Sequence, residues 1–237
     1  MPWVFLLRTF VSENDNKAEG PVSPSKPKNI HLLVACEPLN EEQKLRLELL
    51  GITLVMCGVG TLNACMAAMK SIAAGADYII NIGTAGSHTF PLGTVMQGTG
   101  YVHRSCDARA IMHSITDEEG NLMFPDWEQY RMPFEEEIVL EPKRILNTDL
   151  VQGLVFTGNN TNGHTETSEM YPAFDCVEME AHAIAKVCID AGIPFDSFKF
   201  ISDGAGESVG EEWNQNADSI PYDELIDLIV AGLGLTA

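Results

Sequence analysis

Short apolar runs alternate with helical patterns along much of this 237-residue chain, and this alternation constrains its fold more than any other feature. The runs 30–36, 52–58 and 77–83 are apolar, and the segments 40–51 and 61–75 between them are patterned as helices. Short continuous apolar runs are typical of strands that are buried on both faces. The sequence therefore predicts a β-α-β-α-β series and a largely parallel sheet covered by helices on both faces.

The second half of the chain extends this pattern. Further strands are predicted at 153–158 and 195–204, a helix at 178–188, and a terminal helix at 222–234. Residues 105–141 mix acidic, aromatic and proline residues without clear periodicity, so we expect an excursion over a pocket or a subunit interface.

The start of the chain differs from the rest in composition. Residues 12–29 are polar and rich in proline and serine, with nothing to bury, so we expect a flexible leader at 1–29 and a single domain at 30–237. The first residues lack the cationic region of a secretory signal. The six cysteines show no metal-binding spacing and are interpreted as reduced thiols, which favours a cytoplasmic location.

The charge of the chain excludes several classes of partner. With 34 acidic and 14 basic residues, the formal net charge is −20. This charge would repel phosphate backbones and anionic lipids, so we expect no nucleic-acid and no membrane partner. A small ligand in a shielded pocket remains compatible with it. The six histidines show no paired ligand spacing, and we expect neither a metal nor another cofactor.

Two glycine-rich segments follow predicted strands. GVGTLNA (58–64) lies where a dinucleotide fingerprint would begin a helix, but Asn63 replaces its third glycine. A tight turn is the better interpretation, although such a turn still aims backbone N–H groups at a ligand. NIGTAGS (81–87) ends a strand with small residues, which predicts either close approach of a ligand to the backbone or a simple turn.

The strand within FKFISDGAGE (198–207) leads directly into Asp203. A partly desolvated carboxylate at the carboxyl end of a strand can hold a proton near neutral pH and act as a general acid. The alternative is a helix N-cap, a position at which aspartate is preferred.

VEMEAHAIAKVC (177–188) places Glu178 and Glu180 two positions apart at the head of a helix. Residues at this spacing are not neighbours on a helix surface, so one glutamate should cap the helix or meet solvent while the other points to a pocket. Alternatively, both simply favour the positive end of the helix dipole.

In this order, GVGTLNA, NIGTAGS…PLGTV, VEMEAHAIAKVC and FISDGAG resemble the nucleoside phosphorylase and nucleosidase superfamily, especially its methylthioadenosine/S-adenosylhomocysteine nucleosidases. The resemblance covers residues 30 to roughly 230. It implies a three-layer αβα fold with a central, mostly parallel, mixed twisted sheet. It also implies a homodimer that binds a purine nucleoside and cleaves its N-glycosidic bond.

The same resemblance implies roles for single residues. Glu180 accepts hydrogen bonds from the ribose hydroxyls, and Met179 packs on the sugar. Asp203, beside Ser202, donates a proton to purine N7 as the glycosidic bond breaks. Such a pair suits an oxocarbenium-like transition state, because an acid neutralises the leaving purine while an anion holds the sugar.

A further group of residues completes the implied binding site. The Gly-Thr-Ala-Gly stretch of the family matches Gly83 to Gly86, with Ala85 and Gly86 beside the base and sugar. Thr84 and Val177 are assigned to the same site.

One departure from the family pattern concerns the attacking water. The glutamate that activates water in the family's nucleosidases falls on Leu39, so Glu37 or Glu41 is expected to substitute for it. The phosphate-binding arginine of the phosphorylases is replaced by Asn40, which favours hydrolysis over phosphorolysis.

Another departure concerns the base. Thr161 stands where the family has an aromatic residue that stacks on the purine, and Phe156, Tyr130 or Trp127 could compensate. The composition favours a cytoplasmic protein, and the resemblance implies a homodimeric purine nucleosidase. A phosphate-dependent phosphorylase and a catalytically degenerate nucleoside-binding protein are the alternatives, and a dehydrogenase would depend on GVGTLN alone.

Overall fold

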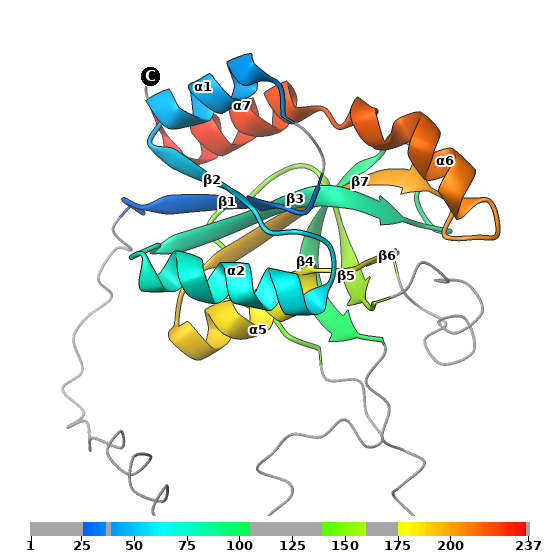
Figure 1. The fold of residues 1–237 in the computed structure, drawn as a ribbon, viewed down its shortest axis with the longest axis horizontal. Helices are drawn as coiled ribbons and strands as arrows, with labels where there is room; N and C mark the ends of the chain where they lie inside the picture. The colour runs from blue at the N-terminus through cyan, green and yellow to red at the C-terminus, as the bar shows by residue number, and fades with distance from the viewer. Residues whose placement is uncertain (1–25, 37–38, 105–138, 160–174, 236–237) are drawn as a thin grey trace, which may run out of the picture.

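A computed structural model of the chain describes residues 26–36, 39–104, 139–159 and 175–235. Within these ranges the chain forms one mixed sheet with helices on both faces (Figure 1). The strands are β1 Ile30–Val34, β2 Ile52–Met56, β3 Tyr78–Gly86, β4 Val95–His103, β5 Val151–Thr157, β6 Cys176–Glu178 and β7 Phe195–Asp203. The helices are α1 Glu41–Leu49, α2 Thr61–Ala73, α5 Ala181–Ala191, α6 Val209–Asn216, the 3-10 turn η2 Ala217–Ser219 and α7 Tyr222–Leu233.

The sheet is mostly parallel, as the sequence predicts. β1 pairs in parallel with β2 and β3, β3 with β7, and β5 with β4 and β6. The pairs β3–β6 and β4–β7 are antiparallel. Because β3 contacts both β6 and β7, the strands β3, β6, β5, β4 and β7 close into a ring, from which β1 and β2 extend.

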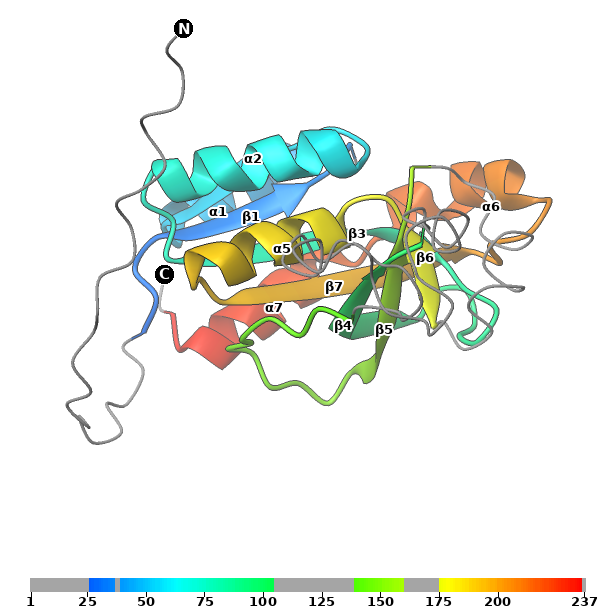
Figure 2. The same cartoon turned by 90° about the horizontal axis from the view of Figure 1, so that it is seen from below.

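The two faces of the sheet carry separate apolar cores. Ile30, Leu32 and Val34 face α1 and α7, whereas Leu33 packs on the opposite face with α2 and α5. This division follows from the alternation of side chains along a strand, and it places His31 on the same face as Leu33. Figures 1 and 2 show the two helical layers on opposite sides of the sheet. None of the helices in the described ranges is long and apolar enough to cross a membrane.

Most of the predicted elements occur where the sequence places them. The helix predicted at 40–51 is α1, which begins after the capping-box residue Asn40, and the terminal helix predicted at 222–234 is α7. The expectation for residues 105–141 falls largely outside the described residues. The polar helix α6, which follows β7, is not predicted by the sequence pattern.

Candidate active site

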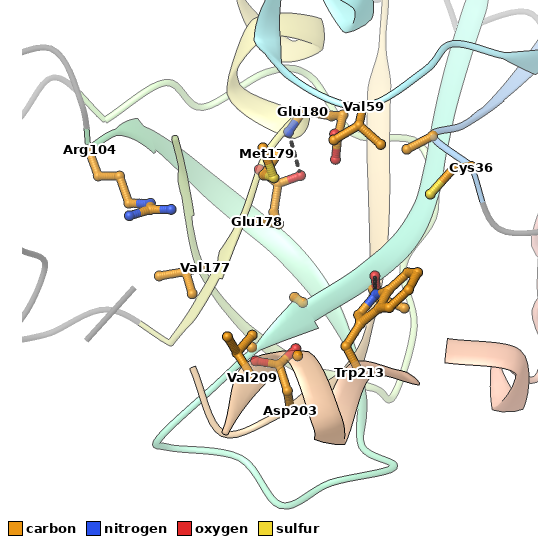
Figure 3. Close-up of a pocket in the computed structure, with 15 residues that line it drawn as sticks. Cys36, Val59, Arg104, Val177, Glu178, Met179, Glu180, Asp203, Val209 and Trp213 are labelled. Carbon is orange, nitrogen blue, oxygen red and sulfur yellow. Dashed lines mark hydrogen bonds between the residues drawn. The ribbon is translucent and has the colours of Figure 1, made fainter. Parts of the chain in front are cut away.

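A cavity of about 350 Å³ opens at the carboxyl ends of β1, β3 and β7, beside the junction of β6 and α5. Ligands in α/β sheets gather at this edge. Seven of the predicted site residues line it, namely Thr84, Ala85, Gly86, Val177, Met179, Glu180 and Asp203. In Figure 3, Glu180 and Asp203 lie on opposite sides of the open space, so segments far apart in the sequence meet in one site.

Asp203 ends β7 and is 4% exposed. Its Oδ1 accepts a hydrogen bond of 2.9 Å from the N–H of Ala205, and its Oδ2 accepts one of 2.9 Å from the hydroxyl of Ser202. Burial raises the pKa of Asp203 above its ordinary value, and these two hydrogen bonds only partly oppose the shift. α6 begins six residues later, at Val209, so Asp203 is not its N-cap.

Gly86 is the neighbour that brings the chain close to this carboxyl group. A Cβ atom on Gly86 would collide with Oδ1 of Asp203 and would lie 2.9 Å from Cβ of Ala205. Glycine is therefore required at this position by close packing and not by its backbone dihedral angle.

Glu178 ends β6 and does not begin the helix predicted at 178–188, because α5 starts at Ala181. Its side chain nevertheless caps α5, as one reading of the sequence predicts. Its carboxylate accepts hydrogen bonds from the N–H of Glu180 at 3.0 Å and of Ala181 at 2.9 Å. The hydroxyl of Thr157 donates to the same carboxylate and accepts from the N–H of His182 at 2.9 Å. Glu178 thus contributes to the wall of the cavity, but its oxygens are occupied within the protein.

Lys199 balances the buried charge of Glu178. Its Nζ lies 2.8 Å from Oε2 of Glu178 and 2.7 Å from Oδ1 of Asn81. Burial alone would raise the pKa of Glu178, but the ammonium group and the hydrogen bonds hold it below its usual value. For Lys199 burial is likewise outweighed, by Glu178 and Glu180, and its pKa is raised. Both groups are therefore charged near neutral pH.

Glu180 is held by the glycine turn at 58–60. Its Oε1 accepts a hydrogen bond of 2.7 Å from the N–H of Gly60. Gly58 and Gly60 have φ angles of 81° and 95°, in the left-handed region that favours glycine. The GVG segment is therefore a tight turn, and its N–H group binds a carboxylate of the protein itself.

The remaining predicted residues lie elsewhere. Ser202 is fully buried and does not line the cavity; its hydroxyl lies within hydrogen-bond distance of Oδ2 of Asp203, at 2.9 Å, and of the carbonyl oxygen of Ala85, at 3.4 Å. The structure does not bring Phe156 into the cavity wall, because its ring packs with Val102, Val177 and Ala205 in a small cluster. The base-stacking position Thr161, together with Tyr130 and Trp127, lies outside the described residues.

The two candidates for placing water differ in position. Glu41 starts α1 with its side chain 91% exposed and paired with Lys44, and it does not line the cavity. Leu39 is 2% exposed in the core. Glu37 lies outside the described residues, but Ala35 and Cys36, which precede it, line the cavity.

Sequence reasoning missed Trp213, which lines the cavity from α6. Its indole N–H donates a hydrogen bond of 3.0 Å to Oγ1 of Thr84 (Figure 3). A polar eight-residue helix gives no signal that one of its residues faces a pocket. The structure thus supplies an aromatic face at a position other than that of Thr161.

Arg104, at the end of β4, is the one basic side chain among the described residues that line the cavity. It shares the wall with three carboxylates, those of Glu178, Glu180 and Asp203. In the ranges that the structure describes, no cluster of histidine, cysteine, aspartate and glutamate could hold a metal ion.

The fold and site define an α/β protein with an acidic ligand pocket at the carboxyl edge of a mixed sheet. The family model described as the phosphorylase superfamily matches residues 42–221, and the chain belongs to this family.

Named relatives agree with this assignment. The chain is 30% identical over 186 residues to the 5'-methylthioadenosine/S-adenosylhomocysteine nucleosidase of Geobacillus kaustophilus, covering 74% of this chain and 76% of that protein. It is 28% identical over 171 residues to the enzyme of the same name from Bacillus subtilis, covering 69% and 73%.

Solved structures share the fold. A mutant methylthioadenosine/S-adenosylhomocysteine nucleosidase of Helicobacter pylori, with 5'-methylthioadenosine in its active site, matches with a TM-score of 0.66 at 21% identity, over 85% of this chain and 97% of that one. The futalosine hydrolase of Helicobacter pylori matches with a TM-score of 0.66 at 20% identity, over 84% and 96%.

Proposed function

We propose that the protein is a purine nucleosidase that hydrolyses the N-glycosidic bond of methylthioadenosine, S-adenosylhomocysteine or a related nucleoside. The observation that carries this proposal is that Asp203 and Glu180 face one cavity from opposite sides. Asp203 protonates N7 of the purine as the C–N bond breaks, and Glu180 holds the ribose hydroxyls. Water adds to the anomeric carbon and loses a proton, which gives the free base and the ribose moiety.

The electrostatics of the pocket support this division of roles. The raised pKa of Asp203 favours the protonated form that a general acid needs. The carboxylate of Glu180 is positioned by Gly60, and a fixed anion stabilises positive charge that develops on the sugar.

Hydrolysis fits the charges of the pocket better than phosphorolysis does. Arg104 alone provides positive charge among the described lining residues, and an inorganic phosphate would have to approach the carboxylate of Glu180 in the same wall. Asn40, at the position of the phosphorylases' arginine, is used as the N-cap of α1 and accepts a hydrogen bond of 2.9 Å from Gln43.

We assign the placing of water to Glu37 in preference to Glu41. Support comes from Ala35 and Cys36 in the cavity wall and from the exposed position of Glu41. Glu37→Gln should lower kcat by about 100-fold or more, the usual contribution of a general base. The matched variant Glu41→Gln should keep kcat within about twofold. Equal losses in the two variants would contradict the assignment.

The activity itself is tested with purified protein and a panel of methylthioadenosine, S-adenosylhomocysteine, adenosine, inosine and AMP. Free base is measured by chromatography with and without inorganic phosphate. Release that is independent of phosphate supports the nucleosidase. Release that requires phosphate would identify a phosphorylase, and nucleoside binding without release would identify a degenerate binding protein.

We further propose that the protein is a cytoplasmic homodimer. Leu62 and Met69, two turns apart on α2, form an exposed apolar surface, with exposed fractions of 75% and 54%. Cys65, Cys176 and Cys188 are free thiols, which suits a reducing compartment. Leu62→Glu should shift the molecular mass in light scattering from dimer to monomer, whereas Leu45→Glu, an exposed leucine on α1, should leave the dimer intact.

A further inference from the structure

A second cavity, of about 340 Å³, lies between α2 and the strands β1 and β2, at the edge of the sheet that β2 forms. It shares no lining residue with the nucleoside pocket. Its polar lining comes from His31 on β1, Cys57 after β2, and Asn63, Lys70 and Ser71 on α2. Its volume is within the range of small-molecule sites.

Two of the residues that line this cavity carry a buried polar atom without a hydrogen-bond partner in the described part of the chain. His31 is 6% and Ser71 is 3% exposed. Neither Nδ1 of His31 nor Oγ of Ser71 has a hydrogen-bond partner within the part of the chain that the structure describes. A buried polar group without a partner is costly, so each such group calls for a partner in the cavity.

The charges around the cavity indicate the kind of partner. Lys70 is the cationic residue of the lining, and no described aspartate or glutamate lines it, although the chain has 34 acidic residues. The hydroxyl of Ser71, the ring N–H that His31 carries when Nδ1 is protonated, and the ammonium group of Lys70 are all donors. A lining that offers these donors and no described carboxylate suits an acceptor with negative charge.

We propose that this cavity is a second binding site, which takes a small oxyanion, either a phosphate or a carboxylate group. Ser71 and His31 hydrogen-bond the oxygens of the anion, and Lys70 neutralises its charge. Burial lowers the pKa of the unliganded His31 ring. A bound anion should raise this pKa again, because it stabilises the protonated ring.

The test follows the His31 ring by NMR in the full chain, with its signals assigned by their loss in His31→Gln. Inorganic phosphate, acetate and chloride are titrated separately at matched ionic strength. Phosphate or acetate should shift the His31 signals saturably and raise the His31 pKa, and chloride should not. The ion that binds more tightly distinguishes a phosphate site from a carboxylate site.

Two variants separate this site from general ion effects. Lys70→Met should weaken the binding about tenfold, the usual effect of losing one charge-assisted contact. Lys186→Met removes an exposed lysine of α5 that pairs with Asp190, and it should leave the binding unchanged. No saturable shift with either oxyanion, or equal affinity in both lysine variants, would overturn the proposal and leave a cavity filled with water only.

Discussion

Lys199 and Glu178 form an ion pair in the interior, with Nζ 2.8 Å from Oε2 and both side chains only 1% exposed. The pair links β7 to the end of β6, from which Glu178 also binds the N–H groups of Glu180 and Ala181 at the start of α5. The ion pair therefore supports the segment that presents Glu180 to the nucleoside pocket.

Removing one partner of this pair should be costly. Glu178→Gln leaves Lys199 without a counter-charge and should lower the free energy of unfolding by about 3–5 kcal/mol, as for other buried pairs. Lys199→Met should lower the free energy of unfolding less in the Glu178→Gln background than in the unsubstituted protein, because it removes the uncompensated charge. Urea unfolding of the two single variants and the double variant measures this coupling. The exposed pair Lys186–Asp190 is the control, and Asp190→Asn should cost less than about 1 kcal/mol. Strictly additive losses would show that the pair is not coupled.

Glu180 should affect turnover and not stability. Glu180→Gln keeps an oxygen that can accept from Gly60 but removes the negative charge that faces the sugar. We expect kcat/KM to fall about tenfold to 100-fold, the worth of a hydrogen bond to a charged group, with little change in melting temperature. Steady-state kinetics and thermal unfolding of the same samples measure both quantities. If activity is retained in Glu180→Gln, the ribose must be bound by another group.

The fold was largely predictable because its strands are continuous apolar runs and its helices are bounded by turns and caps. The ring closure was not predictable, because β3–β6 and β4–β7 join strands that are distant in sequence. A local pattern contains no information about which distant strands will pair.

A place in the cavity wall was predictable where a residue type occurs within a recognisable motif, as for Asp203 and Glu180. Lys199 gave one signal that could have been used, since a lysine within an apolar strand requires a buried counter-charge. Its partner could not be chosen among the many acidic residues. Nothing in the sequence around Trp213 indicates that it lines the cavity, because this depends on how α6 is placed against the sheet. The exposure of Glu41 likewise depends on how α1 is placed.

The stability of the protein should depend on pH because the pKa of Asp203 is raised in the folded state. A carboxyl group whose pKa is higher in the folded than in the unfolded protein contributes stability at low pH, where it is protonated. This contribution is lost as the pH rises through the pKa of the folded state. Asp203→Asn cannot ionise. The melting temperature of this variant should therefore rise relative to that of the unsubstituted protein as the pH is raised from acid to neutral. A difference in melting temperature that stays constant with pH would show that the pKa is not raised. Activity of the variant should fall about 100-fold to 10,000-fold.

Trp213 should contribute to nucleoside binding. Its indole faces the cavity and is fixed by Thr84, so it offers the purine or sugar a rigid aromatic surface. Trp213→Leu should weaken nucleoside binding by about 1–3 kcal/mol, the usual worth of an aromatic contact to a base, and Trp213→Phe should recover most of it. Calorimetric titration in the Asp203→Asn background measures binding without turnover. Equal affinities in all three proteins would place the nucleoside away from α6.

The most direct test of the central claim uses methylthioadenosine in phosphate-free water labelled with heavy oxygen. The mass of the released sugar shows where its new oxygen originates. If the protein is a nucleosidase that uses Asp203 and Glu180, we expect free adenine and a sugar with one labelled oxygen at the anomeric carbon. We also expect the release of adenine to be nearly abolished in Asp203→Asn. Absence of free base, or its appearance only with phosphate and as an unlabelled sugar phosphate, would contradict the account.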